Sequence, residues 1–129
     1  MHKFWLVAVY CLMACACAGE TPVLHSSYQM AAGPHRYPVT LNFDKSSGQY
    51  WGQYINKYYG TFRLGDKHGQ PTIYFDTIHA TRLNRPERML QPEQAYFDFL
   101  YGNKTYTLTG DELVIKNYHG DYIRFKAVD

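Results

Sequence analysis

The sequence predicts a mainly β fold: a small antiparallel β-barrel, or a strongly curved sheet, with one α-helix packed on it. Three observations support this prediction. Apolar and polar residues alternate in several short runs, glycine-containing turns separate those runs, and one segment near residue 96 changes to helical periodicity. A closed barrel is favoured over an open sheet crossed by a helix, because closure removes exposed strand edges.

The first half of the folded region consists of predicted strands. In residues 39–44 the side chains of Val39, Leu41 and Phe43 share one face, which indicates a half-buried strand. Similar composition and alternation predict further strands over residues 49–54, 59–64 and 72–77, with turns at 45–48 and 65–69. A strand around residues 24–30 has a weaker pattern, because glycine and proline soon follow it.

One helix is predicted over residues 92–101. Pro92 suits the first helical turn, where its missing N–H would have no partner, and Glu93 complements the positive end of the helix dipole. Apolar side chains then recur at helical spacing, at Tyr96, Phe99 and Leu100. Gly102 provides the stop. The alternation that follows predicts a meander of three strands, around residues 106–108, 113–115 and 123–125.

Residues 1–14 are predicted to form a lipoprotein signal peptide. A short basic start precedes an apolar run too short to span a bilayer, and the run ends in Leu12-Met13-Ala14-Cys15, which resembles a bacterial lipobox. Cys15 is therefore expected to carry the lipid, with Cys17 as the second choice. We expect residues 15–22 to form a tether and residues 23–129 to form the domain. The alternative is a plain secretory signal, which would leave a soluble periplasmic or secreted protein.

The sequence also predicts a location and limits the partners. Ala16 follows the lipobox cysteine, where many lipoproteins retained in the inner membrane carry aspartate, so we expect an outer-membrane lipoprotein that faces the periplasm. Its N-terminal lipid would bind the membrane. All three cysteines lie in or beside the signal segment, so the domain contains no thiol for a disulfide. Cleavage of the signal peptide would remove Lys3 and leave one more basic than acidic residue. Because the remaining chain also contains no basic block, a nucleic-acid partner is not expected.

Residues 48–62 carry the most distinctive pattern of the chain. Two aromatic strands, each with a glycine, flank the polar pair Asn56-Lys57, as in a curved sheet that turns a corner. Alternation places Tyr50 and Tyr54 on one face and Trp51 on the other. The aromatic side chains of this segment could line a cavity, form an exposed patch, or fill the core beside ordinary surface tyrosines.

We take four residues as candidate binding residues: Tyr54, Asn56, Tyr59 and Arg82. A guanidinium beside an aromatic sheet could bind an anionic group or a carboxylate of a partner. It could equally stack on tyrosines or bond to carbonyl groups where the chain leaves the sheet, so Arg82 has a functional and a structural interpretation.

Several short motifs follow one another between residues 43 and 115, within the roughly ninety residues that run from Tyr37 onward. They are Phe43-Asp44 and Gly48; Gly52, Asn56, Tyr58, Gly60 and Phe62; Ile78, Thr81 and Arg82; Glu93; and Tyr106, Leu108, Gly110, Leu113 and Ile115. On these residues the chain resembles the META domain of the HslJ-type family, small bacterial envelope proteins first noticed for heat induction and novobiocin tolerance. Ile55 stands where family members commonly carry cysteine, which suggests a core position for Ile55.

The resemblance implies a small antiparallel barrel with one helix, no known enzyme activity, and a role in envelope integrity under stress. We therefore expect a non-enzymatic outer-membrane lipoprotein that acts as a binding or scaffolding module for an envelope protein. The alternative function is a carrier of a lipid or other small apolar ligand inside the barrel.

No catalytic residue, cofactor or metal site is expected. The histidines of the domain show no ligand spacing, and His79, within the family pattern, is a candidate for a buried, hydrogen-bonded side chain. The chain lacks a Gly-x-Ser-x-Gly motif. Asp76, Asp98 and Glu112 could supply paired carboxylates for a hydrolase, but spacing alone does not place them together.

Overall fold

The computed structural model describes residues 23–31 and 38–128, which include nine strands and one helix. The predicted signal peptide, the tether and Cys15 lie outside the described residues. In chain order the elements are β1 (Ser27–Met30), β2 (Thr40–Asp44), β3 (Gln49–Gln53), β4 (Lys57–Lys67), β5 (Gln70–Phe75), β6 (His79–Ala80), α2 (Glu87–Leu100), β7 (Gly102–Thr109), β8 (Glu112–Lys116) and β9 (Tyr122–Ala127).

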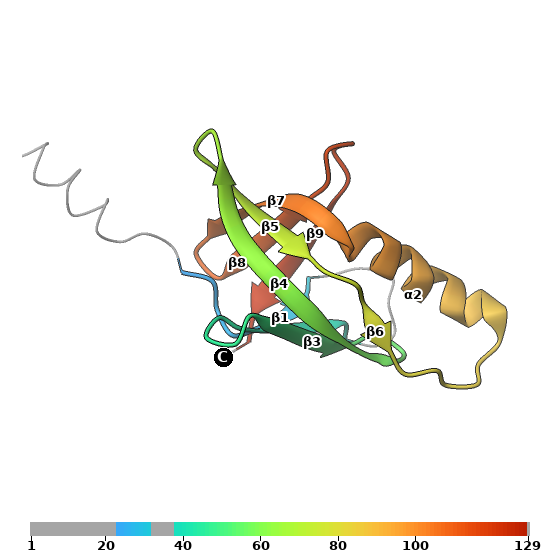
Figure 1. The fold of residues 1–129 in the computed structure, drawn as a ribbon. Helices are drawn as coiled ribbons and strands as arrows, with labels where there is room; N and C mark the ends of the chain where they lie inside the picture. Colours follow the sequence, from blue (N-terminus) through green and yellow to red (C-terminus); the bar gives the residue numbers. More distant parts are fainter. Residues whose placement is uncertain (1–22, 32–37, 129) are drawn as a thin grey trace, which may run out of the picture.

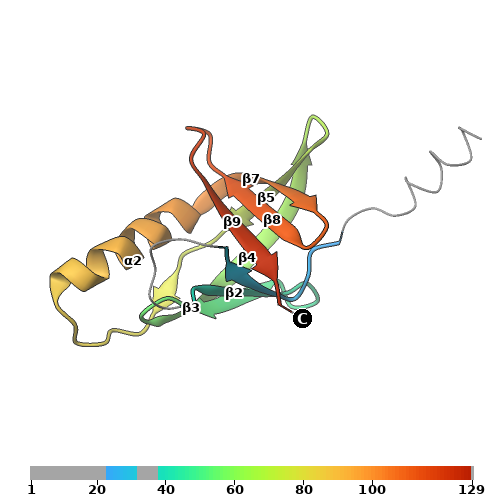
Figure 2. The same cartoon turned by 180° about the vertical axis from the view of Figure 1, so that it is seen from behind.

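Eight of these strands close into an antiparallel barrel, as the sequence predicts. The strands follow the order β3-β2-β1-β9-β8-β7-β5-β4, and β4 pairs with β3 to complete the circle. Figure 1 shows the resulting small barrel with α2 beside it, and Figure 2 shows the same arrangement from behind. The weakly predicted first strand is present as β1, between β2 and β9.

Strand β4 is longer than the sequence predicts and has different neighbours along its length. Its first half pairs with β3, from Gln53↔Lys57 to Gln49↔Thr61. Its second half pairs with β5, and β6 pairs with its beginning on that same side. The short strand β6 is therefore a detached continuation of β5, after a break at residues 76–78.

Large aromatic side chains fill the interior of the barrel. The rings of Tyr50 and Phe75 meet edge to face with centroids 5.1 Å apart, and those of Phe43 and Phe62 meet in the same way at 5.1 Å. Other side chains with no more than 1% exposure complete this core: Tyr28, Val39, Leu41, Tyr58, Ile73, Leu100, Leu113, Ile115 and Phe125. The inside of the barrel is thus occupied by the protein's own side chains.

Two glycines make room for these rings at the corner between β3 and β4. Gly60 lies opposite Tyr50 in the strand register, and a Cβ placed on Gly60 would come within 2.6 Å of the Tyr50 hydroxyl oxygen. Gly52 lies opposite Tyr58, and a Cβ placed on Gly52 would come within 2.0 Å of the Thr40 carbonyl oxygen and 2.6 Å of the Tyr58 hydroxyl oxygen. Each tyrosine therefore covers a glycine on the neighbouring strand, which is why both positions need glycine.

The helix starts earlier than predicted. It begins at Glu87, directly after Pro86 at the N-cap, and Pro92 lies inside it rather than in its first turn. The missing N–H of Pro92 costs one internal hydrogen bond. The burial of one face, which contains Tyr96 and Leu100, offsets this loss. The predicted stop is confirmed: α2 ends at Leu100, and Gly102 has a φ of 94°.

The C-terminal half of α2 packs against the barrel, while its N-terminal turns extend past β6 (Figure 1). In the described part of the chain no helix combines the length and the apolar character needed to cross a bilayer.

Candidate functional site

The elbow between β3 and β4 is held by a carboxylate from α2. The backbone N–H groups of Ile55 and Asn56 donate to Oε2 of Glu93, at 2.8 and 2.6 Å. The side-chain amide of Asn56 donates to Oε1 of Glu93 at 2.6 Å. Both side chains are only 4% exposed. Three donors on one buried carboxylate make a strong, charge-assisted contact between the helix and the elbow.

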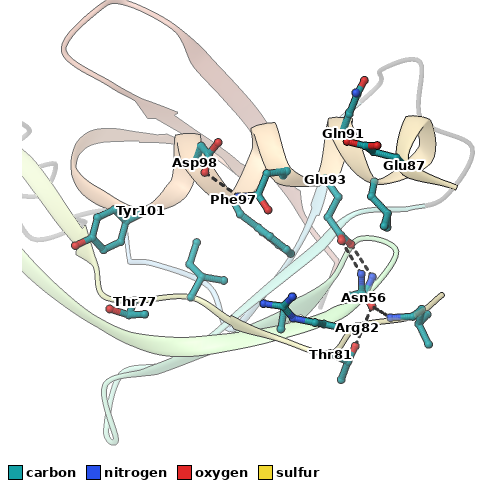
Figure 3. A pocket seen from close by; sticks show the side chains of 15 residues that line it. Asn56, Thr77, Thr81, Arg82, Glu87, Gln91, Glu93, Phe97, Asp98 and Tyr101 are labelled. Atoms are coloured by element: carbon teal, nitrogen blue, oxygen red, sulfur yellow. Dashed lines mark hydrogen bonds between the residues drawn. The ribbon is translucent and has the colours of Figure 1, made fainter. Parts of the chain in front are cut away.

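The other end of the Asn56 side chain holds the segment that follows β6. Its Oδ1 accepts a hydrogen bond from the backbone N–H of Leu83 at 2.7 Å and one from the Thr81 hydroxyl at 3.3 Å. Figure 3 shows this cluster of Asn56, Glu93 and Thr81 at one end of a groove. We call Asn56, Glu93, Thr81 and the backbone N–H groups that they bind the polar clamp.

The polar clamp changes the roles that the sequence suggested for two residues. Asn56 was a candidate binding residue, but its amide is used within the protein on both sides. Glu93 was expected in the first helical turn, where it would complement the helix dipole; instead it lies in the middle of α2 and binds the elbow. One signal could have indicated this: Glu93 shares the helical face of Tyr96 and Leu100, and an acidic residue on a buried face needs a partner.

The tyrosines beside the clamp belong to the core. The hydroxyl of Tyr58 donates to the Thr40 carbonyl at 2.6 Å and lies 2.5 Å from the Tyr96 hydroxyl. Burial raises the pKa of both phenols well above their usual value. Tyr54, another candidate binding residue, is buried with its ring 5.5 Å from that of Tyr96. Burial, and then the charge of Glu93, raises the pKa of Tyr54. Tyr54 therefore stabilises the fold.

A groove of about 870 Å³ runs between α2 and the segment around β6. Its polar lining consists of Asn56, Thr77, Thr81, Arg82, Glu87, Gln91, Glu93, Gln94, Asp98 and Tyr101, and its apolar lining of Ile78, Ala80, Leu83, Leu90 and Phe97. Arg82 points into this space (Figure 3). Among the described residues nothing forms a hydrogen bond or ion pair with its guanidinium, which is exposed. The lining of the groove therefore combines polar and apolar side chains, and the guanidinium of Arg82 is accessible on one side of it.

A second cavity, of about 630 Å³, lies over β3, β4 and β6. Trp51, Tyr59 and His79 are cross-strand neighbours there, and the rings of Tyr59 and His79 stack with centroids 5.2 Å apart. Tyr59 is 59% exposed, so the candidate binding residue is accessible. His79 is exposed as well, and the prediction that it could be buried is wrong, because the alternation of β6 places it opposite Tyr59 on the outer face.

The four candidate binding residues therefore do not form one site. Asn56 and Arg82 line the groove, Tyr59 lines the second cavity, and Tyr54 lies in the core. The carboxylates considered for a hydrolase are also dispersed. Asp98 lines the groove, Asp76 lines the second cavity, and Glu112 lies on β8 opposite Lys126. The described residues contain no group of three or more histidine, cysteine, aspartate or glutamate side chains that could hold a metal ion.

Comparisons with known proteins agree with this fold and this set of motifs. The family model of the META domain matches residues 16–129. The chain belongs to the META-domain family. This META-domain protein has no match among curated proteins.

Two solved structures have the same fold. One is an NMR structure of a protein from Burkholderia xenovorans, with 22% identity, a TM-score of 0.59, and coverage of 78% of this chain and 80% of that chain. The other is an NMR structure with 14% identity, a TM-score of 0.58, and coverage of 79% of this chain and 88% of that chain.

Proposed function

We propose that this META-domain protein is a non-enzymatic binding module of the bacterial envelope, and that the groove beside α2 receives part of another envelope protein. The observation that carries this proposal is the groove itself. It has two walls, an apolar part of the lining that includes Ile78 and Phe97, and an exposed Arg82 with no partner among the described residues. Concave sites with an apolar lining and a few polar groups are typical of binding sites.

The environment of the carboxylates supports a non-enzymatic function. Glu93 is the buried acid of the groove, and three N–H donors already occupy its oxygens, so it is poorly suited to take a proton from a substrate. Asp98 accepts a hydrogen bond from Gln94 at 2.9 Å. Asp76 faces a different cavity, so Asp76 and Asp98 do not form a carboxylate pair of the kind used in glycoside hydrolysis.

The barrel interior offers little support for the alternative function, a carrier of an apolar ligand. Side chains such as Tyr28, Phe75 and Phe125 are fully buried inside the barrel. A lipid would have to displace several of these packed rings. We therefore propose a surface groove, rather than the barrel interior, as the binding site.

The groove can be tested with a photoreactive amino acid in living cells. Tyr101 is 52% exposed and lines the groove, whereas Tyr118 is 90% exposed and does not. We expect p-benzoylphenylalanine at position 101, but not at position 118, to crosslink to one defined envelope protein. Equal crosslinking from the two positions, or none from position 101, would contradict the proposed groove.

We further propose that the lipid on Cys15 holds the domain at the periplasmic face of the outer membrane. The lipobox-like residues Leu12 to Cys15 support this anchor. Globomycin, which inhibits lipoprotein signal cleavage, should cause the precursor to accumulate, and Cys15→Ser should prevent acyl labelling. Cys17→Ser is the matched control and should leave labelling intact. Labelling lost with Cys17→Ser alone would move the anchor to that residue, and labelling unaffected by either change would exclude it.

A role in envelope integrity predicts a phenotype. A strain that lacks the protein should become more sensitive to envelope stress and to antibiotics such as novobiocin. Restoring the gene with the native lipobox should return resistance, and a Cys15→Ser copy should not. Unchanged sensitivity in the deletion strain would count against this role.

A further inference from the structure

The sheet stops at β6, and this leaves backbone groups without a strand partner. In the sheet order β6 is the last strand, with β4 on its inner side. The N–H of Thr81 donates to the carbonyl of Lys57 at 2.9 Å, so residues 79 and 81 direct their backbone groups toward β4. In an antiparallel pair these groups alternate in direction. The N–H and C=O of Ala80 therefore point away from β4, outward from the free edge of the sheet.

The free edge results from the way the chain leaves α2 and enters β7. Strand β7 covers β5 as far as the pair Phe75↔Gly102. The helix ends at Leu100, and only Tyr101 separates it from Gly102, so no strand precedes β7 that could continue along β6. In Figure 1 β6 and α2 diverge from this point. The groove thus occupies the place that the next strand of the sheet would take.

The walls of the groove favour a particular kind of strand. Phe97 and Ile78 provide apolar surface, and both are only half-buried. Glu87 and Asp98 are exposed carboxylates on α2, which forms one wall of the groove. Arg82 belongs to the opposite wall, in the segment that follows β6. With the charge of Glu93 included, the lining carries two more acidic than basic groups. Because alternate side chains of a strand share one face, a complementary strand would direct apolar and basic side chains toward α2.

We propose that the groove binds an extended segment of a partner protein as an added strand, paired through its backbone with the free edge at Ala80 and carrying apolar and basic side chains toward α2. This inference rests on the proposed function and specifies the partner's chemistry. Strand addition supplies affinity through backbone hydrogen bonds and selectivity through alternate side chains. It also covers an exposed strand edge, which is otherwise a liability for aggregation.

The probe for this proposal is a fluorescent nine-residue peptide. Its odd positions alternate valine and lysine, and its even positions are threonine. Binding to the purified full-length protein in detergent is followed by fluorescence polarisation. We expect saturable binding, weakened at least tenfold when glutamate replaces each lysine, because the groove is acidic. An unaltered affinity after that replacement would contradict the charge argument.

Methylation of the peptide backbone distinguishes strand addition from contact through side chains. The N–H groups of alternate residues point to opposite edges of a strand, so methyl groups on the odd or on the even nitrogens block only one edge. We expect one methylated peptide to lose at least tenfold in affinity and the other to bind like the parent. Equal affinities of the two methylated peptides would overturn the proposal.

Variants of Ala80 provide the matched test in the protein. Ala80→Pro removes the outward N–H but none of the bonds to β4, and proline is tolerated on a free edge. Ala80→Val keeps the N–H and suits a strand. We expect Ala80→Pro to weaken binding at least tenfold and Ala80→Val to leave it within twofold, with circular dichroism confirming that both fold. Equal binding by both variants would exclude pairing at this edge.

The peptide experiment tests strand addition, and the crosslinking experiment tests the groove as a binding site, so a negative result in one can be distinguished from a negative result in the other. If position 101 crosslinks to an envelope protein but the parent peptide does not bind, the groove remains a binding site and the strand proposal is wrong. If position 101 yields no crosslink, the proposed function itself is contradicted.

Discussion

The barrel wall and the groove beside α2 differ in what holds their two sides together. Across the wall, strands such as β4 and β5 are joined by a continuous backbone ladder and by buried rings on the inner face. Across the groove, β6 and α2 share no backbone ladder, and the polar clamp of Asn56 and Glu93 joins their segments at one end. One polar cluster can therefore fix the width of a groove whose remaining lining stays accessible.

The largest expected effect comes from the barrel wall. Phe75→Ala should lower the free energy of unfolding by about 4 kcal/mol, because it opens a large cavity among packed rings. Leu64→Ala, on the neighbouring strand, is the control. Leu64 is 43% exposed, so its loss should cost less than about 1 kcal/mol. Urea unfolding of both variants measures the difference, and similar costs would mean that the wall does not depend on its inner rings.

The next largest effect should come from the polar clamp. Glu93→Gln keeps the shape of the side chain, but its amide has one acceptor where the carboxylate serves donors on both oxygens. At least one buried donor loses its partner, and the expected cost is about 3 kcal/mol in urea unfolding.

An exchange of the two groups provides the control for the clamp. In the double variant Asn56→Asp with Glu93→Gln, the glutamine oxygen can accept the backbone donors and its amide can donate to the new aspartate. That aspartate can still accept from Leu83 and Thr81. We expect the double variant to recover most of the lost stability. A double variant less stable than Glu93→Gln alone would show that the charge of residue 93, rather than the pattern of donors and acceptors, maintains the clamp.

Alkaline pH should destabilise the barrel core, because several of its tyrosines are buried. Burial raises the pKa of Tyr50, Tyr58 and Tyr96 in the folded state. Above about pH 10 the unfolded chain loses these protons and the folded chain keeps them, so stability falls as pH rises through this range. Burial lowers the pKa of Lys104, which acts in the opposite direction, but one lysine opposes these three tyrosines and Tyr54, whose pKa burial also raises.

Thermal unfolding between pH 8 and 11.5 tests this expectation. Tyr50→Phe removes one titrating group and should make the loss of stability above about pH 10 shallower than in the parent. Tyr118→Phe, at an exposed position, should leave the slope unchanged. Identical slopes for the parent and both variants would contradict the role of buried phenols.

The barrel and the groove also differ in how far their structure could be predicted from the sequence. The barrel follows local rules: alternation located β2, β3 and β5, and closure followed from the number of short strands. The groove depends on contacts between distant segments. Sequence reasoning places the helix start at Pro92, which suits a first helical turn, whereas α2 begins at Glu87 after Pro86. Since Glu93 binds residues 37 and 38 positions away, its role required the fold.

The same limit applied to the aromatic residues. Alternation correctly separated buried Tyr50 and Tyr54 from exposed Trp51. It could not show that Tyr59 and His79 become neighbours, because β6 is only two residues long and pairs with β4 through the fold. Short edge strands have too few residues for a periodic signal.

The smallest effect on stability is expected from a substitution of Arg82. The size of this effect distinguishes a binding role of Arg82 from a structural one. Its exposed guanidinium has no hydrogen bond or ion pair among the described residues, so Arg82→Gln should change the free energy of unfolding by less than about 0.5 kcal/mol. If Arg82 binds a partner, the same variant should reduce crosslinking from position 101 severalfold. Lys126→Gln, which removes an exposed ion pair with Asp111 away from the groove, should change neither quantity. A loss of more than about 1 kcal/mol with Arg82→Gln would instead assign Arg82 to the support of the chain where it leaves the sheet.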